Sequence, residues 1–226
     1  MIIGYVNLGG ILEAEGRSRE VRETYRRGLA MAESMLATSP GSAELRERLA
    51  NLLYNMGVAM LNEGETVESV RAIRQQAGIF DDLLARKVAS TKQHIRNFRD
   101  DCATAHYGLG RALQAAGDLR AAADELRRSL ALWREIVADF AGAAETYSRL
   151  GLAKTQLALA DLTDPKEAER LISEGLSMLR DLEPRSPSSQ ELRSVLDNAR
   201  QAQAGKRAAR SKLHAAFAHI NYEGAQ

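Results

Sequence analysis

The stretch GLGRALQAAGDLRAAADELRRSL, residues 108–130, contains Gly110 and, seven residues later, Gly117 within an alanine-rich and otherwise helical pattern. Each glycine costs about 1 kcal/mol relative to alanine inside a helix, so the pair must serve something other than helix formation. A glycine within a helix lets another segment approach closely, and a glycine in the left-handed conformation ends a helix. The stretch therefore predicts a helix that packs closely at Gly110, ends at Gly117 and is followed by a second helix.

The same pair of glycines recurs along the chain. The first members are Gly9, Gly57, Gly110 and Gly151, and the second members are Gly16, Gly64 and Gly117. The fourth copy, which begins at Leu150, lacks a second glycine. The first glycines follow one another at intervals of 48, 53 and 41 residues. Self-similarity at such a period indicates an array of stacked helical hairpins.

The second helix of each hairpin is expected to begin on a capping residue. The candidates are Ser18, Thr66, Asp118 and Asp164, because their side-chain oxygens can accept from backbone N–H groups in the first helical turn. Asp164 carries the strongest signature. Pro165 follows it at the first helical position and Glu167 at the third, as is typical of helix starts.

These residues resemble the tetratricopeptide repeat (TPR), whose signature is W-x2-L-G-x2-Y followed by A-x3-F. In the third copy the matching positions are His106, Leu109, Gly110, Leu113, Ala122 and Leu126. In the first copy they are Tyr5, Leu8, Gly9, Leu12, Val21 and Tyr25, and in the second Leu53, Met56, Gly57, Met60, Ser69 and Ile73. The resemblance implies an all-α fold, a right-handed α-α superhelix of TPR-like helical hairpins.

The repeats are longer than the conventional 34 residues. The first excess, 14 residues, corresponds to about two turns on each helix, and we expect residues 31–40 and 41–50 to supply them. Such long repeats resemble the arrays attached to bacterial serine/threonine protein kinases. The predicted organisation is an array of about four hairpins at residues 1–183, a capping helix at 184–204 that begins with Ser188 and Glu191, and a basic tail at 205–226.

Composition argues against several classes of function. The 31 basic and 30 acidic residues give a net charge of +1, so bulk electrostatics give no argument for a nucleic-acid or membrane partner, and a nucleic-acid partner is not expected. The single cysteine, Cys102, excludes an internal disulfide and is compatible with a cytoplasmic location. No apolar run approaches the roughly 20 residues of a membrane span, and the N-terminal residues lack the features of a signal peptide.

No catalytic constellation is predicted, so the chain is interpreted as not being an enzyme. The glycine-rich loop, strand lysine, HRD and DFG motifs of a kinase are absent. Cys102 and His106 are four residues apart and share a helix face, but we interpret Cys102 as a small core residue and His106 as filling the bulky repeat position. His214 and His219 are five residues apart, a poor spacing for one helix face. No metal, cofactor or small-molecule substrate is therefore predicted.

The concave face of the array is the predicted partner-binding surface. By resemblance, first-helix residues line it, and the chosen candidates are Asn51, Tyr54, Tyr107, Arg111, Gln114 and Ser148, with Val58 and Thr155 as further positions. Tyr and Arg are enriched among the residues that dominate binding energy. Packing between adjacent repeats is the alternative role for each of them.

The predicted function is that of a protein–protein interaction scaffold, which holds a partner peptide or helix in its groove. The alternative is the C-terminal regulatory region of a larger bacterial serine/threonine protein kinase. Ile2, Ile3 and Val6 are expected to face nothing at an uncapped array end, which could self-associate. A third interpretation rests on the tail: residues 198–222 contain five basic residues, so a basic helix there could bind an anionic polymer or membrane surface.

Overall fold

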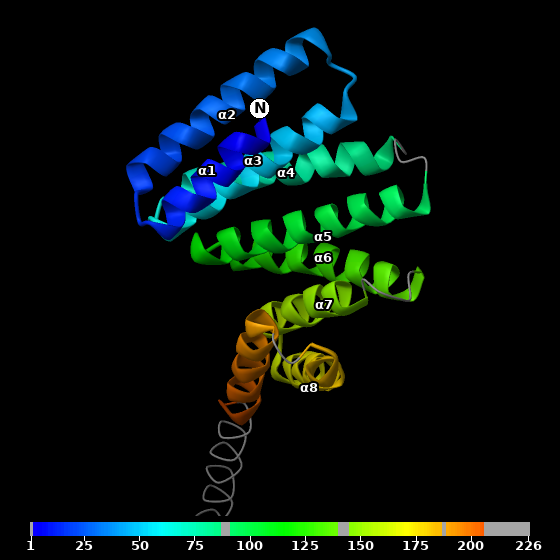
Figure 1. Cartoon of the computed structure of the whole chain (residues 1–226). Coiled ribbons are helices and arrows are strands. Elements are labelled where there is room, and N and C mark those ends of the chain that lie inside the picture. Colours follow the sequence, from blue (N-terminus) through cyan, green and yellow to red (C-terminus); the bar gives the residue numbers. More distant parts are fainter. Residues whose placement is uncertain (1, 87–90, 140–144, 187–188, 206–226) are drawn as a thin grey trace, which may run out of the picture. The chain divides into compact units, whose positions relative to one another are not determined.

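The computed structural model describes residues 2–86, 91–139, 145–186 and 189–205 (Figure 1). In these ranges the chain is helical and contains no strand, so the predicted all-α class is confirmed. The elements are α1 (Ile2–Ala14), α2 (Ser18–Thr38), α3 (Ala43–Asn62), α4 (Thr66–Ala85), α5 (Lys92–Ala115), α6 (Leu119–Asp139), α7 (Glu145–Ala160), α8 (Pro165–Leu182), the short 3-10 helix η1 (Glu183–Arg185) and a helix at residues 190–205.

The helices form two compact units, Met1–Phe140 and Ala141–Gln226. In the first unit α1 to α6 make three antiparallel hairpins, and each helix packs against the next one along the chain (Figure 1). Helix α3 also contacts both α1 and α5, so the first helices of successive hairpins are neighbours. In the second unit α7 packs against α8. This neighbour-by-neighbour packing is that of a helical repeat array.

The second glycine of each pair forms the turn of its hairpin, as predicted. Gly16, Gly64 and Gly117 have φ values of 72°, 82° and 85°, a conformation that side chains disfavour. The same two backbone hydrogen bonds close each turn. In the third hairpin Gly117 N donates to Gln114 O at 3.1 Å and Asp118 N donates to Leu113 O at 3.0 Å. This pair of bonds is the Schellman motif that ends many helices.

The first glycine of each pair lets the two helices of its hairpin approach closely, also as predicted. A methyl group added at Gly110 would lie 2.7 Å from Cγ of Leu126 and 3.2 Å from the carbonyl oxygen of Ala122. At Gly9 it would meet the ring of Tyr25 at 2.2 Å, and at Gly57 it would meet Cγ1 of Ile73 at 2.5 Å. All three separations between the glycine and its partner are 16 residues, so the three hairpins share one register.

The capping predictions are half right. Asp118 Oδ1 accepts from Ala121 N at 3.1 Å, and Asp164 Oδ1 accepts from the N–H groups of Lys166 and Glu167. Ser18 and Thr66 are not caps. They are the first residues of α2 and α4, whose N-cap positions hold Arg17 and Glu65 with no side-chain cap bond.

The position of the N-cap relative to the turn glycine explains why Ser18 and Thr66 were wrongly predicted as caps. The residue directly after the turn glycine is the N-cap in each of the three hairpins, and only the third hairpin has a capping residue there, Asp118. Ser18 and Thr66 stand one residue too late.

In the second unit, Ser189 Oγ accepts from Leu192 N at 3.2 Å at the start of the helix at 190–205. The expected cap, Ser188, lies outside the described residues. Lys154 on α7 forms an ion pair with Glu191 on this helix, with 2.7 Å between Nζ and Oε1. The tail beyond residue 205 also lies outside the described part of the chain. None of the described helices combines the length and apolar character that a bilayer span requires.

Candidate partner-binding surface

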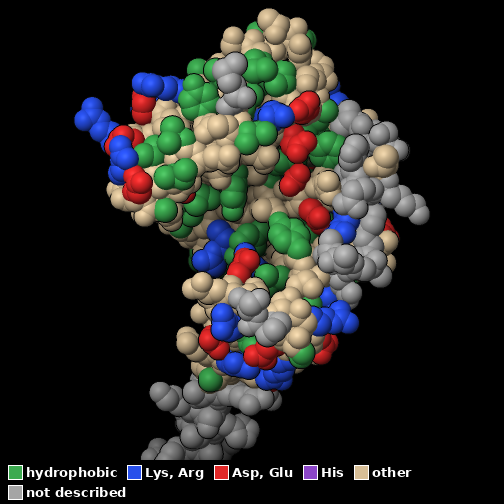
Figure 2. Space-filling view, viewed as in Figure 1, with side chains coloured by type: hydrophobic (Ala, Val, Ile, Leu, Met, Phe, Trp, Pro, Cys, Tyr) green, Lys and Arg blue, Asp and Glu red, His purple; other side chains and the backbone are tan. Residues whose placement is uncertain are grey.

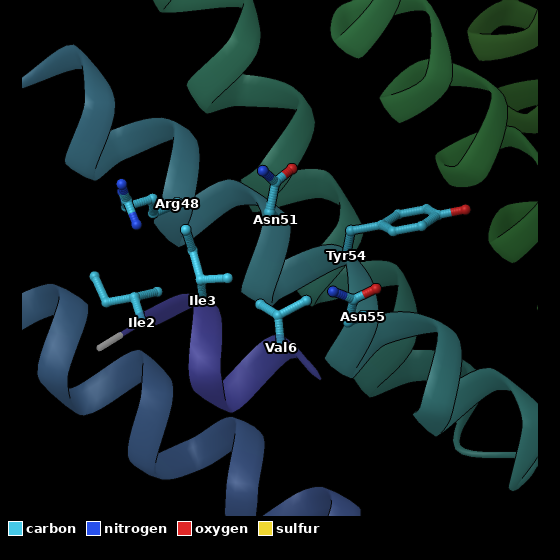
Figure 3. Close-up of a pocket in the computed structure, with 7 residues that line it drawn as sticks. All are labelled: Ile2, Ile3, Val6, Arg48, Asn51, Tyr54 and Asn55. Carbon is cyan, nitrogen blue, oxygen red and sulfur yellow. The ribbon is translucent and has the colours of Figure 1, made fainter. Parts of the chain in front are cut away.

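A pocket of about 230 Å³ lies between α1 and α3 in the first unit. Its lining residues are Ile2, Ile3 and Val6 from α1 and Arg48, Asn51, Tyr54 and Asn55 from α3 (Figure 3). Arg48 and Tyr54 lie three residues on either side of Asn51, and Asn55 lies four residues after it, so all three are on the same side of the helix as Asn51. The pocket therefore has an aliphatic side supplied by α1 and a mainly polar side supplied by α3.

The polar side can form hydrogen bonds with a bound chain. Asn51 and Asn55 each carry an amide that both donates and accepts. Arg48 forms an ion pair with Glu44, one turn earlier on α3, with 2.6 Å between Nη2 and Oε1. The seven lining residues include one cation and no acid, so the pocket suits an apolar side chain that is flanked by carbonyl or carboxylate oxygens.

Two of the six predicted site residues, Asn51 and Tyr54, line this pocket. The ring of Tyr54 extends from α3 toward the next hairpin (Figure 3). There it lies against Gly108 of α5, where an added methyl group would be 3.1 Å from Cε2 of the ring. Tyr54 is thus both a lining residue and part of the packing between hairpins, the two roles that the sequence left open.

The other four predicted residues lie elsewhere. Tyr107, Arg111 and Gln114 are on α5, where Arg111 is exposed and the other two are half-buried. Ser148 is on α7 in the second unit and is 1% exposed, so it presents almost no surface to a partner.

Ile2, Ile3 and Val6 of α1 were expected to face nothing, and that expectation is wrong for Ile2 and Val6. Ile2 is buried in a hydrophobic cluster with residues of α2 and α3, and Val6 packs against the same cluster. Ile3 is 54% exposed. Arg48 and Asn55 were not predicted as site residues, although their spacing from Asn51 places them on the same helix face.

Helix α1 carries exposed apolar side chains as well as the residues that line the pocket. Ile3, Leu8 and Ile11 are the large exposed hydrophobic residues of this helix, and Gly4 and Gly10 have no atom within 4 Å of an added methyl group. Hydrophobic side chains gather over the first helices in the upper part of Figure 2. Exposed apolar residues that gather in one region of a surface are candidates for an interaction site.

A cluster of titratable side chains lies inside the first unit, where α4, α5 and α6 meet. His106 on α5 is 3% exposed. Its Nδ1 lies 2.7 Å from Glu125 Oε2 on α6, and its Nε2 lies 3.1 Å from Asp81 Oδ1 on α4. Cys102, one turn before His106, donates from Sγ to the same Asp81 oxygen at 3.3 Å. The predicted burial of Cys102 and His106 is correct, but both have polar partners.

The cluster determines the protonation of its members. Burial acts to lower the pKa of His106, but hydrogen bonds to Asp81, Cys102 and Glu125 outweigh it and raise the pKa to about 11. The hydrogen bond from His106 lowers the pKa of Asp81. Burial raises the pKa of the Cys102 thiol. At neutral pH the site therefore holds an imidazolium, a neutral thiol and the Asp81 carboxylate.

Comparisons with known proteins identify the architecture. No family model matches the chain, and no curated protein matches it by sequence. A solved structure from Podosopora anserina, described as a kinesin light chain with nearly identical TPR-like repeats, superposes with a TM-score of 0.52 at 17% identity, over 90% of this chain and 95% of that one. A single-substitution variant of the same protein gives a TM-score of 0.52 at 16% identity, over 91% and 96%.

The fold is TPR-like. The yeast histone chaperone Hif1, described as a scaffold protein recruiting protein complexes to core histones, has a TM-score of 0.54 at 12% identity, over 91% of this chain and 94% of that one. The similarity to TPR-like structures agrees with the equal spacing between the close-packing glycine and its partner in the three hairpins. At these identities it establishes the fold alone.

Proposed function

We propose that this chain is a non-catalytic protein-interaction scaffold whose α1–α3 pocket receives an apolar side chain of a partner peptide or helix. The observation that carries the proposal is the pocket itself, in which aliphatic residues of α1 face amide groups of α3. An apolar anchor that enters such a pocket loses its contact with water, while the amides pair with the backbone polar groups beside it.

The exposed apolar residues of α1 extend the proposed site. A partner helix that places one side chain in the pocket would cover Ile3 and Ile11 with its other apolar residues. Burial of apolar area would supply most of the affinity, at about 25 cal/mol per Å² before the costs of association. The Asn amides and Arg48 would then determine register and direction. The scaffold role of one TPR-like neighbour, Hif1, supports the same class of function.

The test compares capture of partners from the native lysate by three baits: the intact chain, Ile3→Ser and Val67→Ser. Val67 is a matched control because it is an aliphatic residue, 65% exposed, that does not line the pocket. We expect one defined protein to bind the intact chain and Val67→Ser, and to be depleted at least tenfold on Ile3→Ser. Both residues are exposed, so neither substitution should alter the fold.

A photo-crosslinking side chain at Asn51 then shows whether the captured protein occupies the pocket. Asn51 is exposed and lines it. Crosslinks from Asn51 to the captured protein support the proposal, and crosslinks to a second copy of this chain identify self-association through this pocket instead. Equal capture by all three baits, with no crosslink from Asn51, would show that the pocket is not the binding site.

A further inference from the structure

The cluster of Cys102, His106, Asp81 and Glu125 is not required by the fold. The three hairpins of the first unit share one register, so each position in the third hairpin has an equivalent in the second. Cys102, His106 and Glu125 correspond in this way to Leu49, Leu53 and Ala72, which are buried apolar residues. The same helix packing is therefore built in the second hairpin without polar groups.

Polar residues at these buried positions lower the stability of the fold unless they are paired. Burying a charged or polar group is unfavourable unless its partners satisfy it, and a buried ion pair is often no more stabilising than the apolar residues that could replace it. His106 needs two carboxylates to hold it, and these come from two other helices. A set of polar groups that the scaffold does not need is more readily explained by a ligand.

The geometry points to a divalent metal ion, and we propose that Cys102 Sγ, His106 Nε2 and Asp81 Oδ1 bind Zn²⁺. One ligand atom from each of these three residues lies within 4.8 Å of the other two. Around tetrahedral zinc, bond lengths of about 2.0–2.3 Å separate neighbouring ligand atoms by about 3.3–3.7 Å. The observed distances to Asp81 Oδ1, 3.1 Å from Nε2 and 3.3 Å from Sγ, need to open by only a few tenths of an ångström.

Asp81 can provide that movement because its side chain is 50% exposed, whereas Cys102 and His106 are buried. The exposed side of Asp81 also gives the ion a path from solvent and leaves a fourth position for water. Glu125 acts through His106. It accepts from Nδ1 at 2.7 Å, which orients the ring and directs Nε2 toward the other two ligands, an arrangement typical of zinc-binding histidines.

The charges balance when the ion binds. In the structure, Nε2–H of His106 and S–H of Cys102 both point at the same oxygen of Asp81. Zn²⁺ replaces these two protons, which pass to the buffer, and bonds form from zinc to Sγ, Nε2 and Oδ1. Nδ1 keeps its proton and its bond to Glu125. Two positive charges leave and two arrive, so the net charge of the buried site does not change.

The first measurement uses Co²⁺ as a spectroscopic substitute for Zn²⁺ on the full chain after treatment with a chelator. We expect one ion per chain and a thiolate-to-cobalt charge-transfer band, which Zn²⁺ removes when it displaces the cobalt. Calorimetric titrations with Zn²⁺ in buffers of different ionisation enthalpy should report the release of two protons for each ion bound.

Four variants locate the site. Cys102→Ser should abolish the charge-transfer band, and Asp81→Asn should weaken binding of Zn²⁺ at least tenfold. Glu125→Gln, which changes a positioning residue, should weaken it about 10–100-fold while keeping the band. Asp124→Asn is the matched control because Asp124 is an exposed acid beside Glu125 that pairs with Arg127, and it should bind as the intact chain does.

Asp81→Asn alters a half-exposed side chain, so it remains informative if Cys102→Ser fails to fold. Absence of a cobalt–thiolate band in the intact chain would overturn the proposal. So would Zn²⁺ binding that is unchanged in both Cys102→Ser and Asp81→Asn, since the ion would then be held elsewhere on the chain.

Discussion

Substitution of Gly110 by alanine tests the role of the first glycine in each hairpin. Two opposing effects determine the result. Alanine is favoured over glycine in a helix interior by about 1 kcal/mol. Against this gain, the added methyl group would lie 2.7 Å from Cγ of Leu126. Cγ is the branch point of a side chain with no exposed surface, so it cannot swing aside, and overpacking of this kind costs about 1–3 kcal/mol.

Gly78 provides the matched control. It lies within α4 in the same unit, is exposed, and has no atom within 4 Å of an added methyl group. Gly78→Ala should therefore show the helix gain alone, a stabilisation of about 1 kcal/mol. The gain is common to both variants, so their difference isolates the overpacking. We expect Gly110→Ala to be less stable than Gly78→Ala by about 1–3 kcal/mol, or roughly 2–12 °C in Tm.

The assay is urea unfolding followed by tryptophan fluorescence. Trp133 is the only tryptophan, is buried on α6 and lies in the same unit as both glycines, so its emission reports on that unit. Circular dichroism of the native variants checks that helix content is unchanged. If Gly110→Ala proves as stable as Gly78→Ala, the close approach between α5 and α6 does not require glycine, and the inference from the repeated glycines is refuted.

Substitutions at two further positions test the turns and caps. Gly117→Ala places a side chain at a φ of 85°, which should destabilise the first unit by about 1–2 kcal/mol. Gly117→Asn should recover part of the lost stability, because asparagine tolerates that conformation better than alanine does. The Trp133 fluorescence assay measures the stability of both variants. Asp164→Ala removes the acceptor of the Lys166 and Glu167 N–H groups and should cost about 0.5–2 kcal/mol. Amide exchange in the first turn of α8 should accelerate, and unchanged exchange there would contradict the role of this cap.

The hairpins could be predicted because the signals for them are local. A turn glycine with positive φ satisfies a requirement of the backbone within a few residues, and a close-packing glycine meets a side chain of the same hairpin, 16 residues later. The capping positions were harder, because a shift of one residue decides whether a side chain reaches the N–H groups. Ser18 and Thr66 have suitable side chains, but Arg17 and Glu65 hold the N-cap positions.

The candidate sites depend on contacts that no local pattern contains. Asn51 and Tyr54 were named as candidates because the resemblance implies that first-helix residues line the concave face, but their pairing with α1 depends on how the two hairpins stack. His106 matched the bulky repeat position, and nothing in the sequence pattern indicated that Asp81 and Glu125, 25 and 19 residues away, would reach its two nitrogens. A repeat signature describes the residue type that is usual at a position. It therefore gives no information about a copy in which that position holds a different type of residue.

Both candidate sites nevertheless lie at positions where one hairpin differs from its neighbours. Leu53 and His106 occupy equivalent positions, and the first is held by apolar contacts while the second is held by two carboxylates. Likewise α1 and α3 are equivalent first helices, yet one face of α1 leaves Ile3 and Ile11 exposed. In an array each hairpin depends mainly on its neighbours, so one position can be altered for binding without rebuilding the others. The repeat scaffold thus explains the fold, and the positions that break its pattern are the ones to test for function.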